Sequence, residues 1–159
     1  MKTKFIFLLF SAGLLALPLA VHADELSQKL ADLIQPGQWE STVHIQMSVV
    51  GTNMTLPAQT TTTKRCVKQD DFDDLAAPDM KNMKCNITQK ELSGNTLHLG
   101  LTCTGKKGTF TLNGTTTFAS RTSSTSHYVM TGEMRGMQMK FVSDSQSKRI
   151  GDCTKSSGH

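Results

Sequence analysis

Several sequence patterns that mark well-known activities are missing from this chain. It has no Gly-x-Ser-x-Gly, His-Glu-x-x-His or P-loop pattern, so nothing points to a serine hydrolase, a zinc protease or a nucleotide-binding enzyme. Without Lys2 and Lys4 near the N-terminus, 17 − 2 = 15 basic side chains remain against 13 acidic ones, and this excess is too small to indicate nucleic-acid binding. We therefore expect a protein that is not an enzyme, has no cofactor and does not bind nucleic acid.

A Cys-x-x-Cys pair is also missing, and the spacing of the four cysteines fits no zinc pattern. An even number of cysteines is typical of disulfides in an exported chain, and the N-terminal run described next predicts export. We therefore expect two disulfide bonds among Cys66, Cys85, Cys103 and Cys153.

Only one long apolar run is present, and it lies at the N-terminus. Lys2 and Lys4 precede an uncharged stretch from Phe5 to Leu19, and Val21-His22-Ala23 has the small-x-small pattern of a cleavage site. The stretch is shorter than the roughly 20 apolar residues that span a bilayer. We predict that residues 1–23 are a signal peptide, and that residues 24–159 form one domain in the periplasm or outside the cell, without a membrane anchor.

A helix is predicted over residues 24–35, before the chain becomes extended. Leu26, Leu30, Leu33 and Ile34 form one apolar stripe, and Pro36-Gly37 ends the helix. From Trp39 to Val49 apolar and polar residues alternate, which predicts a half-buried strand with Trp39 as a core anchor. The Thr-rich stretch from Gln59 to Val67 suits an edge strand.

The segments Cys85 to Glu91 and Thr96 to Cys103 flank Ser93-Gly94-Asn95 and form a predicted β-hairpin. A three-residue loop centred on Gly94 places Cys85 opposite Cys103. This register predicts a Cys85–Cys103 disulfide and, by elimination, a Cys66–Cys153 disulfide. If the loop is Gly94-Asn95 instead, the register slips by one residue and the cysteines are no longer directly opposed.

The remaining strands complete the predicted fold. Gly108 to Ser120 is followed by a strand around Tyr128 to Met134, and Arg135-Gly136 is a candidate turn that pairs Met134 with Met137. Consecutive strands joined by short turns predict a meander. We expect a mainly β domain, a curved antiparallel meander of about seven strands that resembles a half-open barrel, over residues 36–153. The helix would cover its mouth, and residues 154–159 would be a frayed tail.

Four methionines are the sharpest candidate for a metal site, because thioether sulfurs suit monovalent copper. The predicted turn puts them on one apolar face beside Tyr128 and Phe141, where methionine fills gaps. We favour packing and keep copper binding as the alternative. The four residues are Met130, Met134, Met137 and Met139.

His44, His98 and His127 are candidate ligands or general bases. Each alternates with apolar neighbours in a predicted strand, so we expect each to face solvent, and the sequence shows no carboxylate or nucleophile partner for them. The acidic segment from Asp70 to Leu75 lacks the ligand spacing, central Gly and terminal Glu of a calcium loop. We predict a single helical turn there, with acidic residues at its N-terminus.

Segments spread over residues 36–153 carry a resemblance to a known family: Pro36 to Glu40, Met54, Pro57, Cys66, Cys85, Gly94-Asn95-Thr96, Cys103, Gly108, Gly114, Met137 to Lys140 and Arg149 to Cys153. In these segments the sequence resembles the exported bacterial family called domain of unknown function 3617. The resemblance implies a periplasmic or secreted protein and assigns no catalytic residues. With the residues above, it leaves a small apolar ligand or an envelope protein as the expected partner, soft-metal binding as the alternative, and an enzyme in last place.

Overall fold

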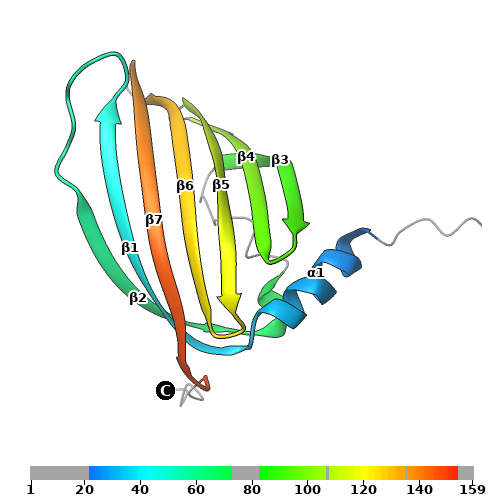
Figure 1. Ribbon diagram of the computed structural model, residues 1–159. Helices are drawn as coiled ribbons and strands as arrows, with labels where there is room; N and C mark the ends of the chain where they lie inside the picture. Colours follow the sequence, from blue (N-terminus) through cyan, green and yellow to red (C-terminus); the bar gives the residue numbers. More distant parts are fainter. Residues whose placement is uncertain (1–21, 73–82, 107, 135, 154–159) are drawn as a thin grey trace, which may run out of the picture.

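The computed structural model describes residues 22–72, 83–106, 108–134 and 136–153. One helix and seven strands form the domain, and all the strands belong to a single antiparallel sheet, which confirms the mainly β fold (Figure 1). The elements are α1 (His22–Leu33), β1 (Gly37–Val49), β2 (Gln59–Val67), the 3-10 helix η1 (Gln69–Phe72), β3 (Met83–Ser93), β4 (Thr96–Gly105), β5 (Gly108–Ser120), β6 (Ser123–Met134) and β7 (Met137–Gly151).

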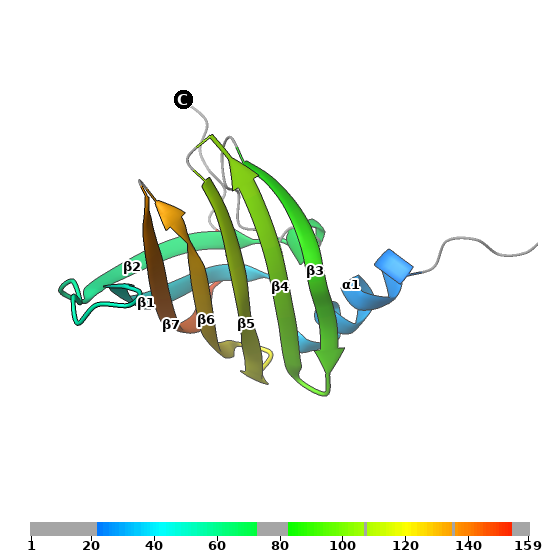
Figure 2. The ribbon, with the colours of Figure 1, turned by 90° about the horizontal axis from the view of Figure 1, so that it is seen from above.

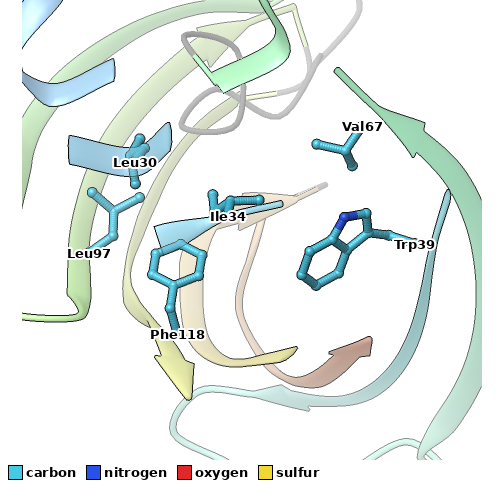
Figure 3. Close-up of a cluster of buried hydrophobic side chains, with 6 residues drawn as sticks. All are labelled: Leu30, Ile34, Trp39, Val67, Leu97 and Phe118. Carbon is cyan, nitrogen blue, oxygen red and sulfur yellow. The ribbon is translucent and has the colours of Figure 1, made fainter. Parts of the chain in front are cut away.

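One apolar stripe holds α1 to the sheet. Leu30 and Ile34, which follows the helix, are 1% and 4% exposed, and they pack in one cluster with Trp39, Val67, Leu97 and Phe118 (Figure 3). The helix begins at His22, slightly before the expected Asp24. Because a helix of 12 residues is marginal by itself in water, this docking is what stabilises it. No helix in the described part of the chain is long and apolar enough to cross a bilayer.

The order of the strands in the sheet is β2-β1-β7-β6-β5-β4-β3, which differs from a simple meander. Strands β3 to β7 do follow one another, and the turn between β6 and β7 pairs Met134 with Met137 as predicted. The first strand, however, pairs with the last one along its whole length, from Gln38 opposite Gly151 to Val49 opposite Met139. As a result β2 is an edge strand, as expected, and β3 is the other edge.

The turn of the β3–β4 hairpin differs from the predicted turn, but Cys85 still lies opposite Cys103. Ser93 pairs with Thr96, so the loop consists of Gly94 and Asn95 alone, and the three-residue loop is wrong. Gly94 has a φ of 59°, a left-handed conformation that glycine adopts without strain. The register then shifts between Ile87 and Gln89, where one extra residue forms a bulge. This shift returns Cys85 to a position opposite Cys103.

Both disulfides have the expected partners. Cys85 is bonded to Cys103 across the hairpin, and Cys66 at the end of β2 is bonded to Cys153 just after β7. The second bond joins segments that lie on either side of β1, because Gln38 pairs with both Cys66 and Gly151. It therefore closes the chain around the start of β1.

The sheet is strongly curved, and its edges β2 and β3 do not pair with each other (Figure 2). The alternating apolar side chains point to the inside of the curve, where α1 packs (Figure 3). Leu97, Leu99 and Leu101 of β4 are all buried on this concave face, whereas the exposed side chains of His44 in β1 and His127 in β6 lie on the convex face. The cluster around Leu30 contains residues of β1, β2, β4 and β5, so α1 bridges the two halves of the open sheet.

Candidate functional site

A cavity of about 580 Å³ lies between α1 and the concave face of the sheet. This volume is within the range of small-molecule sites, which is about 300 to 1,000 Å³. One side of it, the apolar wall, comes from α1, β4 and β5. The wall consists of Leu30, Ile34, Leu97, Leu99, Leu112 and Phe118.

The opposite surface of the cavity is polar. Five serines of the adjacent strands β1, β7 and β6 face inward there, and we call them the hydroxyl floor: Ser41, Ser124, Ser126, Ser143 and Ser147. The inner face of a curved sheet normally carries Leu, Ile or Val, whose side chains fill the space between the layers. Serine is much smaller, so these five positions leave the space open, and this accounts for the cavity.

Hydrogen bonds tie part of the hydroxyl floor together. The Oγ atoms of Ser41 and Ser147 lie 2.7 Å apart across β1 and β7. Thr116 Oγ1 in β5 lies 2.8 Å from both Ser126 Oγ and the Tyr128 hydroxyl. Within the described part of the chain, Ser124 and Ser143 have no side-chain hydrogen bond, so their hydroxyls are available to a bound molecule.

Tyr128 lies where the apolar wall meets the hydroxyl floor. Its ring packs against the buried cluster of Leu99, Leu101 and Cys103. Burial raises the pKa of the phenol above its usual value, because the phenolate would be poorly solvated, while the hydrogen bond with Thr116 acts in the opposite direction. Tyr128 is therefore neutral at physiological pH and acts as a hydrogen-bonding group, not as a charge.

Trp39 and Val67 close the side of the cavity nearest β2. The indole Nε1 of Trp39 donates a hydrogen bond of 3.0 Å to the carbonyl oxygen of Gln35, in the linker after α1. Trp39 is only 5% exposed and packs against Ile34 (Figure 3). It thus anchors the core, as predicted, and at the same time contributes an aromatic surface to the cavity.

The comparison with protein families covers this site except for Leu30 of α1. Residues 34–153 match the family described as "Protein of unknown function (DUF3617)". The chain belongs to the DUF3617 family. The match begins where the chain leaves α1 and ends at Cys153, so it includes every strand of the sheet. None of the curated proteins and none of the solved structures compared with the chain matches it.

Two segments that carry the DUF3617 resemblance meet in space beside the cavity. Arg149 Nε donates a hydrogen bond of 2.8 Å to the Pro36 carbonyl oxygen, and Arg149 Nη2 pairs with Asp152. Gly37 has a φ of 150°, and a Cβ there would lie 2.5 Å from the carbonyl oxygen of Gly151. The absence of a side chain at Gly37 therefore lets the end of β7 lie close to the start of β1. This contact fixes the direction in which the chain leaves α1.

The three histidines that the sequence singled out in this DUF3617 protein do not line the cavity. His44 and His127 are exposed on the convex face, as expected, whereas His98 is half-buried. The Nδ1 atom of His127 lies 2.7 Å from Asp144 Oδ1, so His127 has a carboxylate partner. The sequence alone did not indicate this partner. The predicted turn at Arg135-Gly136 could have revealed this pair, since the same register continues from Met134 and Met137 to His127 and Asp144.

The methionines do not share one environment. Met139 is 7% exposed, so it packs as expected, but Met137 is 50% exposed, and for this residue the packing prediction is wrong. Met130 is half-buried opposite Phe141, and the register places Met134 opposite Met137. Among the side chains that the structure describes, His, Cys, Asp and Glu form no group of three or more that could hold a metal ion.

The described part of the acidic segment forms a short helical turn. The 3-10 helix η1 covers Gln69–Phe72, and Asp71 Oδ2 accepts a hydrogen bond of 2.7 Å from the backbone N–H of Lys68. The rest of the predicted turn, residues 73–75, lies outside the described residues, as do the predicted signal peptide up to residue 21 and the tail from residue 154.

Proposed function

We propose that this DUF3617 protein is an exported, non-enzymatic binding protein that holds a small, largely apolar ligand in the cavity under α1. The observation that carries the proposal is the cavity itself, which combines the apolar wall with a floor of small hydroxyl side chains. Apolar surface supplies most of the affinity in such sites, and a few polar groups orient the ligand.

Binding can be followed without a label on the protein. Trp39 is the single tryptophan of the chain and lines the cavity, so its fluorescence reports on occupancy. We expect the uncharged dye N-phenyl-1-naphthylamine to bind with one site per molecule, to gain fluorescence and to accept energy from Trp39.

A cavity-filling variant separates specific binding from adsorption. Ser143→Phe adds an aromatic ring to the hydroxyl floor at a half-buried position and should abolish dye binding. Gln146→Phe, the matched control, adds the same ring to an exposed position on the convex face of the same strand and should bind the dye like the wild type. Equal binding by both variants would rule out the cavity as the site.

Export rests on the N-terminal sequence and on the cysteines. Lys2 and Lys4 precede an uncharged apolar stretch, which is the pattern of a signal peptide. Two disulfides persist in oxidising compartments and are rare in the cytosol. We expect the intact mass of protein from the extracytoplasmic fraction to correspond to a chain that starts at Asp24. A mass that includes residues 1–23 would contradict cleavage.

A further inference from the structure

One side chain that lines the cavity carries a positive charge. Arg65, in the edge strand β2, lines the cavity and pairs in the register with Trp39. Its side chain is exposed, and among the described residues it makes no hydrogen bond or ion pair. A guanidinium that lines an apolar cavity and has no counter-ion among the described residues is a ready site for an anion.

The neighbouring basic residues are already engaged. Lys64 precedes Arg65 in β2 but points to the convex face, where its Nζ lies 3.4 Å from Glu40. Lys148 lies 3.2 Å from the same carboxylate. Arg149 donates to Pro36 and pairs with Asp152, so its guanidinium is not available to the cavity. Arg65 is therefore the cavity-lining cation in the described part of the chain that can neutralise a ligand.

The hydroxyl floor begins next to Arg65 and runs across the sheet. Ser41 of β1 is two residues from Trp39, the cross-strand partner of Arg65, so it is the diagonal neighbour of Arg65 on the same face. Ser41 pairs with Ser147, and Ser147 pairs with Ser124. Phe118 of the apolar wall lies opposite Ser124. Along this row the side chains change from cationic through hydroxylic to apolar, and Trp39 and Val67 add apolar surface at the Arg65 end.

This gradient matches a molecule that is polar at one end and apolar at the other. We infer that the cavity binds a single-chain amphiphile with an anionic head group, either a carboxylate or a phosphate monoester. The head group lies at Arg65 and accepts a hydrogen bond from the hydroxyl of Ser41, which in turn accepts one from Ser147. The apolar chain lies along Leu97, Leu99 and Phe118. This inference rests on the proposed function, because it specifies the ligand of the same cavity.

Four ligands with the same alkyl chain test the head group. Decanoate, decyl phosphate, decanol and decyltrimethylammonium are titrated at neutral pH and low salt, with displacement of N-phenyl-1-naphthylamine and Trp39 fluorescence as readouts. We expect at least one of the two anions to bind about tenfold or more tightly than decanol, since a charge-assisted hydrogen bond contributes that much. The tighter of the two identifies the head group. The cation should bind most weakly.

A pair of variants then assigns the preference to one residue. Arg65→Met keeps much of the apolar stem of the side chain and removes the charge, so the anion should lose about tenfold in affinity while decanol is unaffected. Lys64→Gln removes a charge from the neighbouring position on the other face and should leave both affinities unchanged. Far-UV circular dichroism and thermal melts confirm that both variants are folded, and added salt should weaken anion binding in the wild type.

The outcomes separate this inference from the proposed function. If decanol and the dye bind but neither anion binds more tightly than decanol, the anionic ligand is wrong and the apolar cavity stands. The same holds if Arg65→Met weakens decanol and the anions equally. If neither the dye nor any of the four ligands binds, the proposed function itself fails.

Discussion

Gly114 lies on the concave face of β5, between Leu99 of β4 and Tyr128 of β6. A Cβ at this position would come within 2.7 Å of Tyr128 Cα and still closer to the carbonyl oxygen of His127, which belongs to the backbone and cannot rotate away. We expect Gly114→Ala to lower the free energy of unfolding by roughly 1 to 3 kcal/mol through overpacking. Urea unfolding measures the loss.

The neighbouring position provides the control for Gly114. Asn113 is exposed on the other face of β5, so Asn113→Ala should change the stability by about 0.5 kcal/mol or less. A Gly114→Ala protein as stable as this control would show that β5 and β6 can move apart without cost.

We expect the free energy of unfolding to fall at alkaline pH because of Tyr128. Burial raises its pKa in the folded protein above the value of about 10 in the unfolded chain. Above that pH the unfolded chain releases the proton while the folded protein still holds it. The contribution of this group is therefore complete below about pH 10 and is lost as the pH rises through the folded pKa.

The only tyrosine of the chain makes this prediction measurable. Absorbance of the phenolate should show that Tyr128 ionises at a higher pH in the folded protein than in urea. Tyr128→Phe loses the hydrogen bond with Thr116 and should lack this part of the alkaline destabilisation. If the unfolding free energies of the wild type and Tyr128→Phe fall in parallel above pH 10, the raised pKa is wrong.

The helix α1 depends on one side chain more than on its own helical propensity. Leu30 is 1% exposed, in the cluster that joins α1 to β1, β2, β4 and β5. Leu30→Ala should cost roughly 2 to 5 kcal/mol, because it removes buried methyl groups and leaves a cavity. We expect the loss in denaturant unfolding, together with faster amide exchange in α1.

Lys29 is the control on the exposed side of the same helix. Its Nζ lies 2.8 Å from Glu25, and its side chain is 57% exposed. Lys29→Ala should cost well under about 1 kcal/mol, since exposed ion pairs contribute little. A similar loss in both variants would mean that α1 is not held by its apolar stripe.

The two disulfides differ in what they contribute to the whole molecule. Cys66 and Cys153 are separated by 87 residues, and Cys85 and Cys103 by 18. In the chain-entropy model the longer loop contributes about 4.6 kcal/mol and the shorter about 3 kcal/mol. The double variant Cys66→Ser/Cys153→Ser should therefore unfold at lower denaturant than Cys85→Ser/Cys103→Ser.

Hydrogen exchange locates these effects. Without the Cys66–Cys153 bond, protection should fall at the end of β2 and the end of β7, which flank the start of β1. Without the Cys85–Cys103 bond, it should fall in β3 and β4 only. A greater loss of stability from the shorter loop would contradict the entropic account.

Features that depend on near neighbours in the chain were predictable. The alternation of Trp39 to Val49, the bounds of β2 and β5, and the pairing of Met134 with Met137 follow from local patterns, and the structure has them. The predicted cysteine pairing was also correct, although the three-residue loop from which it was derived was wrong. A bulge between Ile87 and Gln89 offsets the shorter turn, and its position could not be derived from the turn residues alone.

The strand order and the cavity were decided only by the tertiary structure. Pairing of β1 with β7 joins residues more than a hundred positions apart, such as Ser41 and Ser147, which are 106 positions apart. No local pattern encodes this pairing. Ser124, Ser126 and Ser143 look like surface residues in the sequence, because alternation reveals a buried face only where that face is apolar. Their neighbours across the curved sheet turn them inward under α1, and this is why the candidate binding site could not be predicted from the sequence.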